Sequence, residues 1–225
     1  MFDANKIIRA LQTEGPRMLD ALKTEGRGMT DRVRTDKDSQ NLALGAGAAG
    51  MLGGLLLGSS GKFGRQVATL GGIAAIGTLA YQAWQKHQGA QGAPGQPQPG
   101  GPFLPAPENA AGQEELGKAV IRAMIAATKA DGAISAEERA ALWNRLGSVQ
   151  LDPEEQSFIF DELAKPLNLD EVAAGATSPE LAAEIYAASL VAIDPEKPAE
   201  KAYLGALAGK LKLPAGLVQE IHAAA

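Results

Sequence analysis

Two long stretches without a charged side chain constrain this chain of 225 residues more than any other feature of its sequence. No charge occurs in the 23 residues from Ser39 to Gly61 or in the 20 residues from Gln66 to Gln85. A helix of roughly 20 apolar residues crosses a bilayer, because each residue adds about 1.5 Å towards a hydrocarbon core about 30 Å thick. The polar and basic residues 59–66 suit a turn between two antiparallel helices. We therefore predict a transmembrane helical hairpin over residues 39–86.

Small residues recur inside this predicted hairpin. Eleven of the 27 glycines fall within residues 45–77, and Ala46, Gly50, Gly54 and Gly58 follow one another at four-residue spacing. Such a stripe lets helix backbones approach closely in lipid, so we predict that it packs two hairpin arms or two protomers together. Glycine and alanine add little insertion energy, so a hairpin buried in a soluble core and a peripheral membrane segment remain alternatives.

The regions on either side of the hairpin differ in charge and composition. Residues 1–38 are expected to form a basic arm, either amphipathic on the membrane surface or partly disordered in solvent. Residues 87–110 are rich in proline and glycine, which predicts an extended linker. Residues 111–225 are expected to form a separate acidic domain. Lys and Arg exceed Asp and Glu by 11 to 7 in residues 1–107, whereas acidic residues exceed basic ones by 19 to 10 after that point.

The composition and the helix start signals predict an all-α protein. Hydrophobic residues make up 45% of the chain but aromatic residues only 4%, which disfavours a β-sandwich. Helix starts are indicated by a capping box at Ser135 to Glu138, and by the pairs Asp152-Pro153 and Ser178-Pro179. Pro198 and Pro214 are expected to open the last two helices. We predict a bundle of six to seven short helices after residue 110.

The sequence holds no recognisable catalytic machinery. There is no cysteine, the two histidines are His87 and His222, and neither a phosphate-binding loop nor a zinc motif occurs. The acidic C-terminal half disfavours nucleic acid as a partner. We therefore expect no enzymatic activity and no cofactor, with a hydrolase that uses scattered carboxylates as the remaining alternative.

Two acidic turns in the C-terminal half resemble each other. Asp131 is followed six residues later by Glu137, and Asp194 is followed six residues later by Glu200. A duplicated helix–turn–helix unit would bring these carboxylates, with Glu138, to one place. Asp131 could equally close a turn while Ser135 and Glu138 cap the following helix.

At these turns the chain resembles a known family. Residues 129–138 (KADGAISAEE), the turn around Asp194 and residues 203–214 (YLGALAGKLKLP) are similar to the tellurite-resistance TerB-like helical fold. The whole layout resembles the bacterial inner-membrane family catalogued as domain of unknown function 533. The resemblance implies a TerB-like α-fold and an association with envelope or stress physiology, without an established reaction.

The resemblance also carries a possible metal site to this chain. It would consist of Asp131, Glu137, Glu138, Asp194 and Glu200. The second turn departs from the first, because Pro195 replaces the glycine and Lys201 replaces a carboxylate. Neither turn has the ligand spacing of an EF-hand loop.

We hypothesise that the protein is a membrane-anchored binding or scaffold protein in the bacterial inner membrane. Its partners would be membrane lipid and either another protein or a second copy of the chain. A divalent-metal sensor or buffer at the acidic turns is the alternative. The basic residues outside the hairpin predict both termini in the cytoplasm, whereas a single span would move the C-terminal domain to the opposite side.

Overall fold

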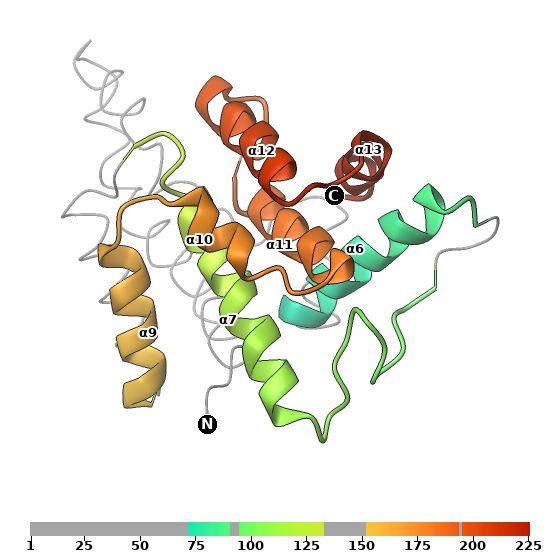
Figure 1. Cartoon of the computed structure of the whole chain (residues 1–225), viewed down its shortest axis with the longest axis horizontal. Helices are drawn as coiled ribbons and strands as arrows, with labels where there is room; N and C mark the ends of the chain where they lie inside the picture. Colours follow the sequence, from blue (N-terminus) through green and yellow to red (C-terminus); the bar gives the residue numbers. More distant parts are fainter. Residues whose placement is uncertain (1–71, 91–94, 133–151, 194) are drawn as a thin grey trace, which may run out of the picture.

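The computed structural model describes residues 72–90, 95–132, 152–193 and 195–225. These residues form helices and connecting loops with no β-strand among them, which confirms the all-α prediction (Figure 1). The described helices are α6 (Gly72–His87), α7 (Ala110–Ala127), α9 (Pro153–Ala164), α10 (Leu169–Ala174), α11 (Pro179–Ala192), α12 (Pro198–Lys210) and α13 (Ala215–Ala224).

The helix starts follow the local cap chemistry. The Asp152 carboxylate accepts hydrogen bonds from the backbone N–H groups of Glu154 and Glu155, and the Glu155 side chain accepts one from the Asp152 N–H. The Ser178 hydroxyl accepts a hydrogen bond from the Leu181 N–H at 3.1 Å. Helix α12 begins at Pro198 and α13 directly after Pro214. These four predicted starts are confirmed, whereas the predicted cap at Ser135 lies outside the described residues.

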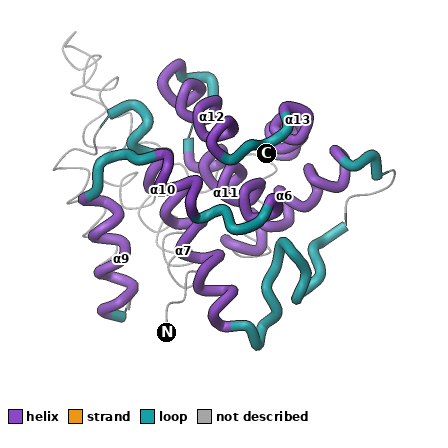
Figure 2. Tube along the Cα trace, in the orientation of Figure 1, coloured by secondary structure: helices purple, strands orange, loops and turns teal. Residues whose placement is uncertain are grey.

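Helix α11 is the central element of the bundle. Eleven of its 14 residues are buried, so it is enclosed nearly all round. It packs against α7 on one side and α6 on another, with α12 and α13 nearby (Figures 1 and 2). Many of its buried residues are alanines, which let the neighbouring helices approach closely.

The second charge-free stretch lies in this protein core. Helix α6 comes from that stretch and packs against α13 and α11. Its core residues are at most 5% exposed: Ile73, Ala75, Ile76, Leu79, Ala80 and Ala83. The structure therefore differs from the prediction of a lipid-facing second arm, because the apolar face of α6 is covered by protein. A buried hairpin in a soluble core was the alternative, and α6 follows that alternative for its part of the stretch.

Residues 95–109 also differ from the predicted extended linker. Phe103 is 4% exposed and meets Tyr81 and Trp84 of α6 edge to face, with ring centroids 5.5 and 5.8 Å apart. The Gly100 N–H donates to the Leu104 carbonyl at 2.8 Å, which closes a turn around Phe103. The loop is therefore attached to α6, and α6 with its loop belongs to the same core as α7.

In the part of the chain that the structure describes, no helix combines the length and the apolar character needed to cross a bilayer. The first charge-free stretch, the N-terminal arm of residues 1–38 and the stripe of Ala46, Gly50, Gly54 and Gly58 lie outside the described residues. A transmembrane role for them stays a prediction.

Candidate functional site

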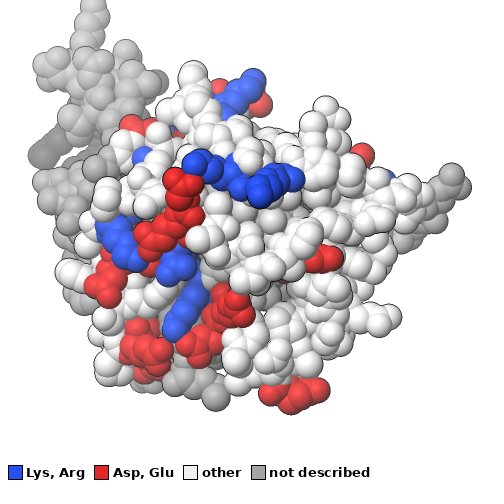
Figure 3. All heavy atoms as spheres, in the orientation of Figure 1, with Lys and Arg blue, Asp and Glu red and all other residues white. Residues whose placement is uncertain are grey.

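Charged side chains gather where α7, α9 and α10 meet. Figure 3 shows Lys and Arg interleaved with Asp and Glu over these helices, while much of the remaining described surface in this view is uncharged. A depression of about 260 Å³, open to solvent, lies among them. We call this depression the charged groove and define it by Arg122, Lys129, Glu162, Lys165, Leu167 and Glu171.

One carboxylate oxygen organises the charged groove. Glu162 Oε1 accepts hydrogen bonds from Arg122 Nε at 3.1 Å, from Arg122 Nη2 at 3.0 Å and from Lys165 Nζ at 3.0 Å. Burial opposes ionisation of Glu162, but these hydrogen bonds outweigh it and lower the pKa of its carboxyl. Glu162 is therefore a fixed negative charge that holds both cations in place.

The rim of the charged groove is more accessible. Lys165 Nζ lies 2.6 Å from Glu171 Oε1, and this hydrogen bond is the main reason that the pKa of Lys165 is raised. Arg122 Nε is 4.0 Å from the same oxygen, beyond hydrogen-bond reach. The Lys165 and Glu171 side chains are 42% and 37% exposed. An exposed ion pair of this kind contributes little stability, so a carboxylate from another molecule can replace Glu171 at low cost.

Lys129 fixes the floor of the charged groove. Its side chain is buried, and its ammonium donates hydrogen bonds to the backbone carbonyls of Glu162 at 2.5 Å and Lys165 at 2.7 Å. These carbonyls lie at the C-terminal end of α9, where helical C=O groups lack partners within the helix. Lys129 therefore joins the end of α7 to the end of α9 and sets the shape of the groove.

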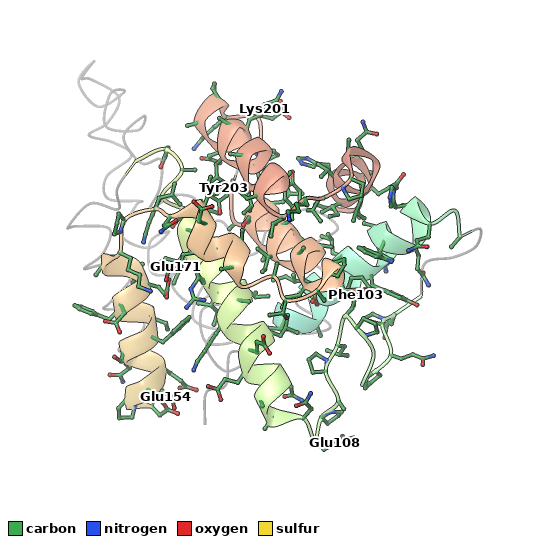
Figure 4. The ribbon with its side chains drawn as sticks, viewed as in Figure 1. Phe103, Glu108, Glu154, Glu171, Lys201 and Tyr203 are labelled. Carbon is green, nitrogen blue, oxygen red and sulfur yellow. The ribbon has the colours of Figure 1, made fainter. Side chains whose placement is uncertain are left out.

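An aromatic ring continues the charged surface towards the start of α9. Phe158 lies beneath Arg122 and Lys118, whose charged groups are 5.5 and 6.0 Å from its ring centroid. Lys118 pairs with Glu114 and with Glu154, and the hydrogen bond to Glu114 is the first cause of its raised pKa. Figure 4 shows Glu154 at the start of α9 and Glu171 on α10, near opposite ends of this charged surface.

The structure separates the two predicted metal ligands that it describes. Asp131 is exposed in the turn after α7, which ends at Gly132 with a φ of 146°. Glu200 is 1% exposed in the first turn of α12, with its Oε1 3.5 Å from Lys197 Nζ. Among the described residues, no three His, Cys, Asp or Glu side chains are grouped so that they could hold a metal. Glu137, Glu138 and Asp194 lie outside the described residues, so metal binding stays a prediction.

The two histidines lie near α13 and away from the charged groove. His222 Nε2 is 2.9 Å from the Tyr186 hydroxyl, and burial lowers the pKa of His222. The ring of His87 lies against the first turn of α13, since a Cβ added to Gly216 would come within 3.1 Å of His87 Nδ1. These contacts give both rings a packing role.

The sequence analysis missed the charged groove. Arg122 and Glu162 are 40 residues apart, and Lys129 and Glu162 are 33 apart. The available signal was Lys129 itself, a cation near the end of an apolar helical pattern, where lysine can pair with free carbonyls. Its partners belong to another helix, and their pairing depends on the tertiary fold.

Comparison with known proteins gives a family and no neighbour with a known role. A family model described as "Protein of unknown function (DUF533)" matches residues 42–225. No curated protein and no solved structure matches the chain. The match spans both the end of the first charge-free stretch and the whole helical bundle.

Proposed function

The chain belongs to the DUF533 family of proteins of unknown function, and from this premise we propose that it is a membrane-anchored binding or scaffold protein. The charged groove recruits a partner protein through an acidic residue of that partner. The observation that carries this proposal is the arrangement of Arg122 and Lys165, which Glu162 holds in place beside the exposed Glu171.

The partner chemistry follows from the charges and the apolar edge of the charged groove. Arg122, Lys129 and Lys165 outnumber Glu162 and Glu171, so the groove is a positive site on a predominantly acidic half of the chain. Among described residues, Arg122 donates hydrogen bonds through Nε and Nη2 alone, which leaves Nη1 to bind an incoming carboxylate. Leu167, 37% exposed, offers an apolar contact beside it. A partner with an acidic residue next to an apolar one fits this surface.

Residues 39–61 supply the anchor in this proposal. The position of α6 in the protein core leaves this stretch as the candidate for a single transmembrane helix in the bacterial inner membrane. Four basic residues precede it at positions 27, 32, 34 and 37, and two follow it at 62 and 65. The positive-inside rule then places the N-terminal arm in the cytoplasm and the helical bundle on the other side.

The resemblance to TerB-like proteins and their link to envelope stress enter here as proposals. They are supported by the all-α bundle and by the turn that follows α7. They imply that the partner belongs to the cell envelope.

Site-specific photo-crosslinking in living cells tests the binding role. A crosslinker in place of Leu167 should give a discrete adduct with one partner, and a crosslinker in place of the exposed Gln219 on α13 should not. Adding Lys165→Glu should abolish the Leu167 adduct, whereas the matched surface change Lys201→Glu on α12 should leave it intact. Identical adducts from both crosslinker positions, or an adduct indifferent to Lys165→Glu, would refute recruitment through the groove.

Membrane extraction and a topology reporter test the anchor. Carbonate should leave the full chain in the membrane fraction, and removal of residues 39–61 should release it. A reporter after Ala225 should be active only on the side opposite the N-terminus. Release of the full chain by carbonate would overturn the anchor, and a cytoplasmic reporter would overturn the single span.

A further inference from the structure

A buried carboxyl lies where α6 meets the rest of the bundle. Glu184 on α11 is 1% exposed, and its Oε1 has no hydrogen-bond partner among the described residues. A Cβ built on Gly77 of α6 would lie 3.1 Å from Glu184 Oε1 and 2.8 Å from the Phe103 carbonyl oxygen. The missing side chain at Gly77 therefore makes room for the Glu184 carboxyl between α6, α11 and the loop that carries Phe103.

The elements next to this carboxyl offer it no compensating positive charge. On α6 the basic residues are Lys86 and His87, both in the last turn, more than two turns beyond Gly77. The described loop of residues 95–109 carries Glu108 as its one charged residue.

Neighbouring helices do not supply a cation either. On α11, Glu180 lies one turn before Glu184 and adds a negative charge. On α13, Glu220 is acidic and His222 is hydrogen-bonded to Tyr186. On α7, Lys118 and Arg122 are bound to Glu114, Glu154 and Glu162 around the other side of the bundle.

Ionisation of Glu184 is therefore unfavourable while α6 is in place. Burial, with a smaller contribution from Glu180, raises the pKa of the Glu184 carboxyl to about 9. Once α6 and its loop move away, the carboxyl reaches water and its pKa returns to the ordinary value of 4.5. Between these two values the separated form binds fewer protons than the docked form, so a rise in pH favours separation.

We propose that Glu184 is a proton-operated latch on α6, which keeps α6 docked on the bundle when it is protonated and releases α6 when it is ionised. The latch goes beyond the proposed function and does not depend on it. Because α6 follows residues 39–61 in the chain, the latch makes the connection between that stretch and the bundle sensitive to pH.

Thiol labelling of the full chain tests the latch, because the protein contains no cysteine of its own. Thr78→Cys places a thiol of similar size on the covered face of α6, where Thr78 is 4% exposed. Ser189→Cys places a thiol at a fully buried position on α11, next to the Ala123 carbonyl of α7. Labelling by a methanethiosulfonate reagent is measured from pH 6 to pH 8 and divided by the rate for the same chain in urea, which removes the titration of the thiol.

The latch predicts three results. The α6 thiol reacts at least about 100-fold faster than the α11 thiol, because α6 opens without the rest of the bundle. Its corrected rate rises about tenfold per pH unit. Glu184→Gln and Glu184→Leu both abolish that rise, whereas Glu180→Gln preserves it.

Other results overturn the proposal. Equal rates for the two thiols would show that α6 separates only when the whole bundle unfolds. A corrected rate independent of pH, or a rise that survives in both Glu184 variants, would show that this carboxyl does not control the docking of α6.

Discussion

Replacement of Lys129 by methionine isolates the contribution of one buried ammonium to the fold. Methionine keeps most of the apolar stem and removes the charged donor that binds the carbonyls of Glu162 and Lys165 at 2.5 and 2.7 Å. A hydrogen bond from a charged group contributes about 1.5–3 kcal/mol, and the carbonyls left behind are partly buried. We expect Lys129→Met to lower the free energy of unfolding by about 3–4 kcal/mol, a combined value for both bonds after the gain from burying the thioether.

Urea unfolding followed by circular dichroism measures this loss. With a slope of about 2 kcal/mol per molar urea, typical of small proteins, the midpoint should fall by about 1.5–2 M at unchanged slope. Lys118→Met is the matched control, because the Lys118 side chain is 29% exposed and its ion pairs are partly solvated. The control should cost less than about 1 kcal/mol. Equal midpoints for the two variants would refute the view that Lys129 joins α7 to α9.

Three further substitutions test other contacts in the core and at a helix start. The folded-state pKa of Glu184 lies above its unfolded value, so its ionisation lowers stability from about pH 4.5 to about pH 9; Glu184→Gln should raise the free energy of unfolding by about 3 kcal/mol at pH 7 and by little at pH 4. Gly77→Ala should cost about 1–3 kcal/mol because its Cβ would meet the Phe103 carbonyl at 2.8 Å, whereas Gly205→Ala, with open space around it on α12, should stabilise by about 0.5–1 kcal/mol. Asp152→Ala should cost about 1–2 kcal/mol through loss of the α9 cap. Urea titrations of each variant beside the parent chain measure all three, and a change of the opposite sign contradicts the corresponding contact.

Helix starts could be predicted from the sequence because their causes are local. Asp152 and Ser178 satisfy N–H groups within three residues of themselves, and the proline after each fits the first turn of a helix. The all-α class followed from the same signals together with the scarcity of aromatic residues. No long-range information was needed for these elements.

The charged groove could not be predicted in this way. A lysine such as Lys129 looks the same in the sequence whether it is solvated or bound to carbonyls of a helix that begins 24 residues later. The groove depends on how α7, α9 and α10 pack, and that packing follows from the apolar contacts of all three with the core. Sequence spacing alone gave equal weight to the acidic turns, where the two described carboxylates differ completely in exposure.

The absence of charge in a stretch of sequence shows that it avoids water, and it does not identify what replaces the water. Helix α6 has no charge before Lys86 because α11, α13 and the loop around Phe103 cover it from several directions. A lipid bilayer would select a similar composition, but it would also require a longer span than the 16 residues of this helix. Residues 39–61 meet that length, and the sequence alone could not tell the two stretches apart. The bundle therefore begins before the proline-rich segment, because a fragment without α6 would expose the apolar faces of α11 and α13 to water.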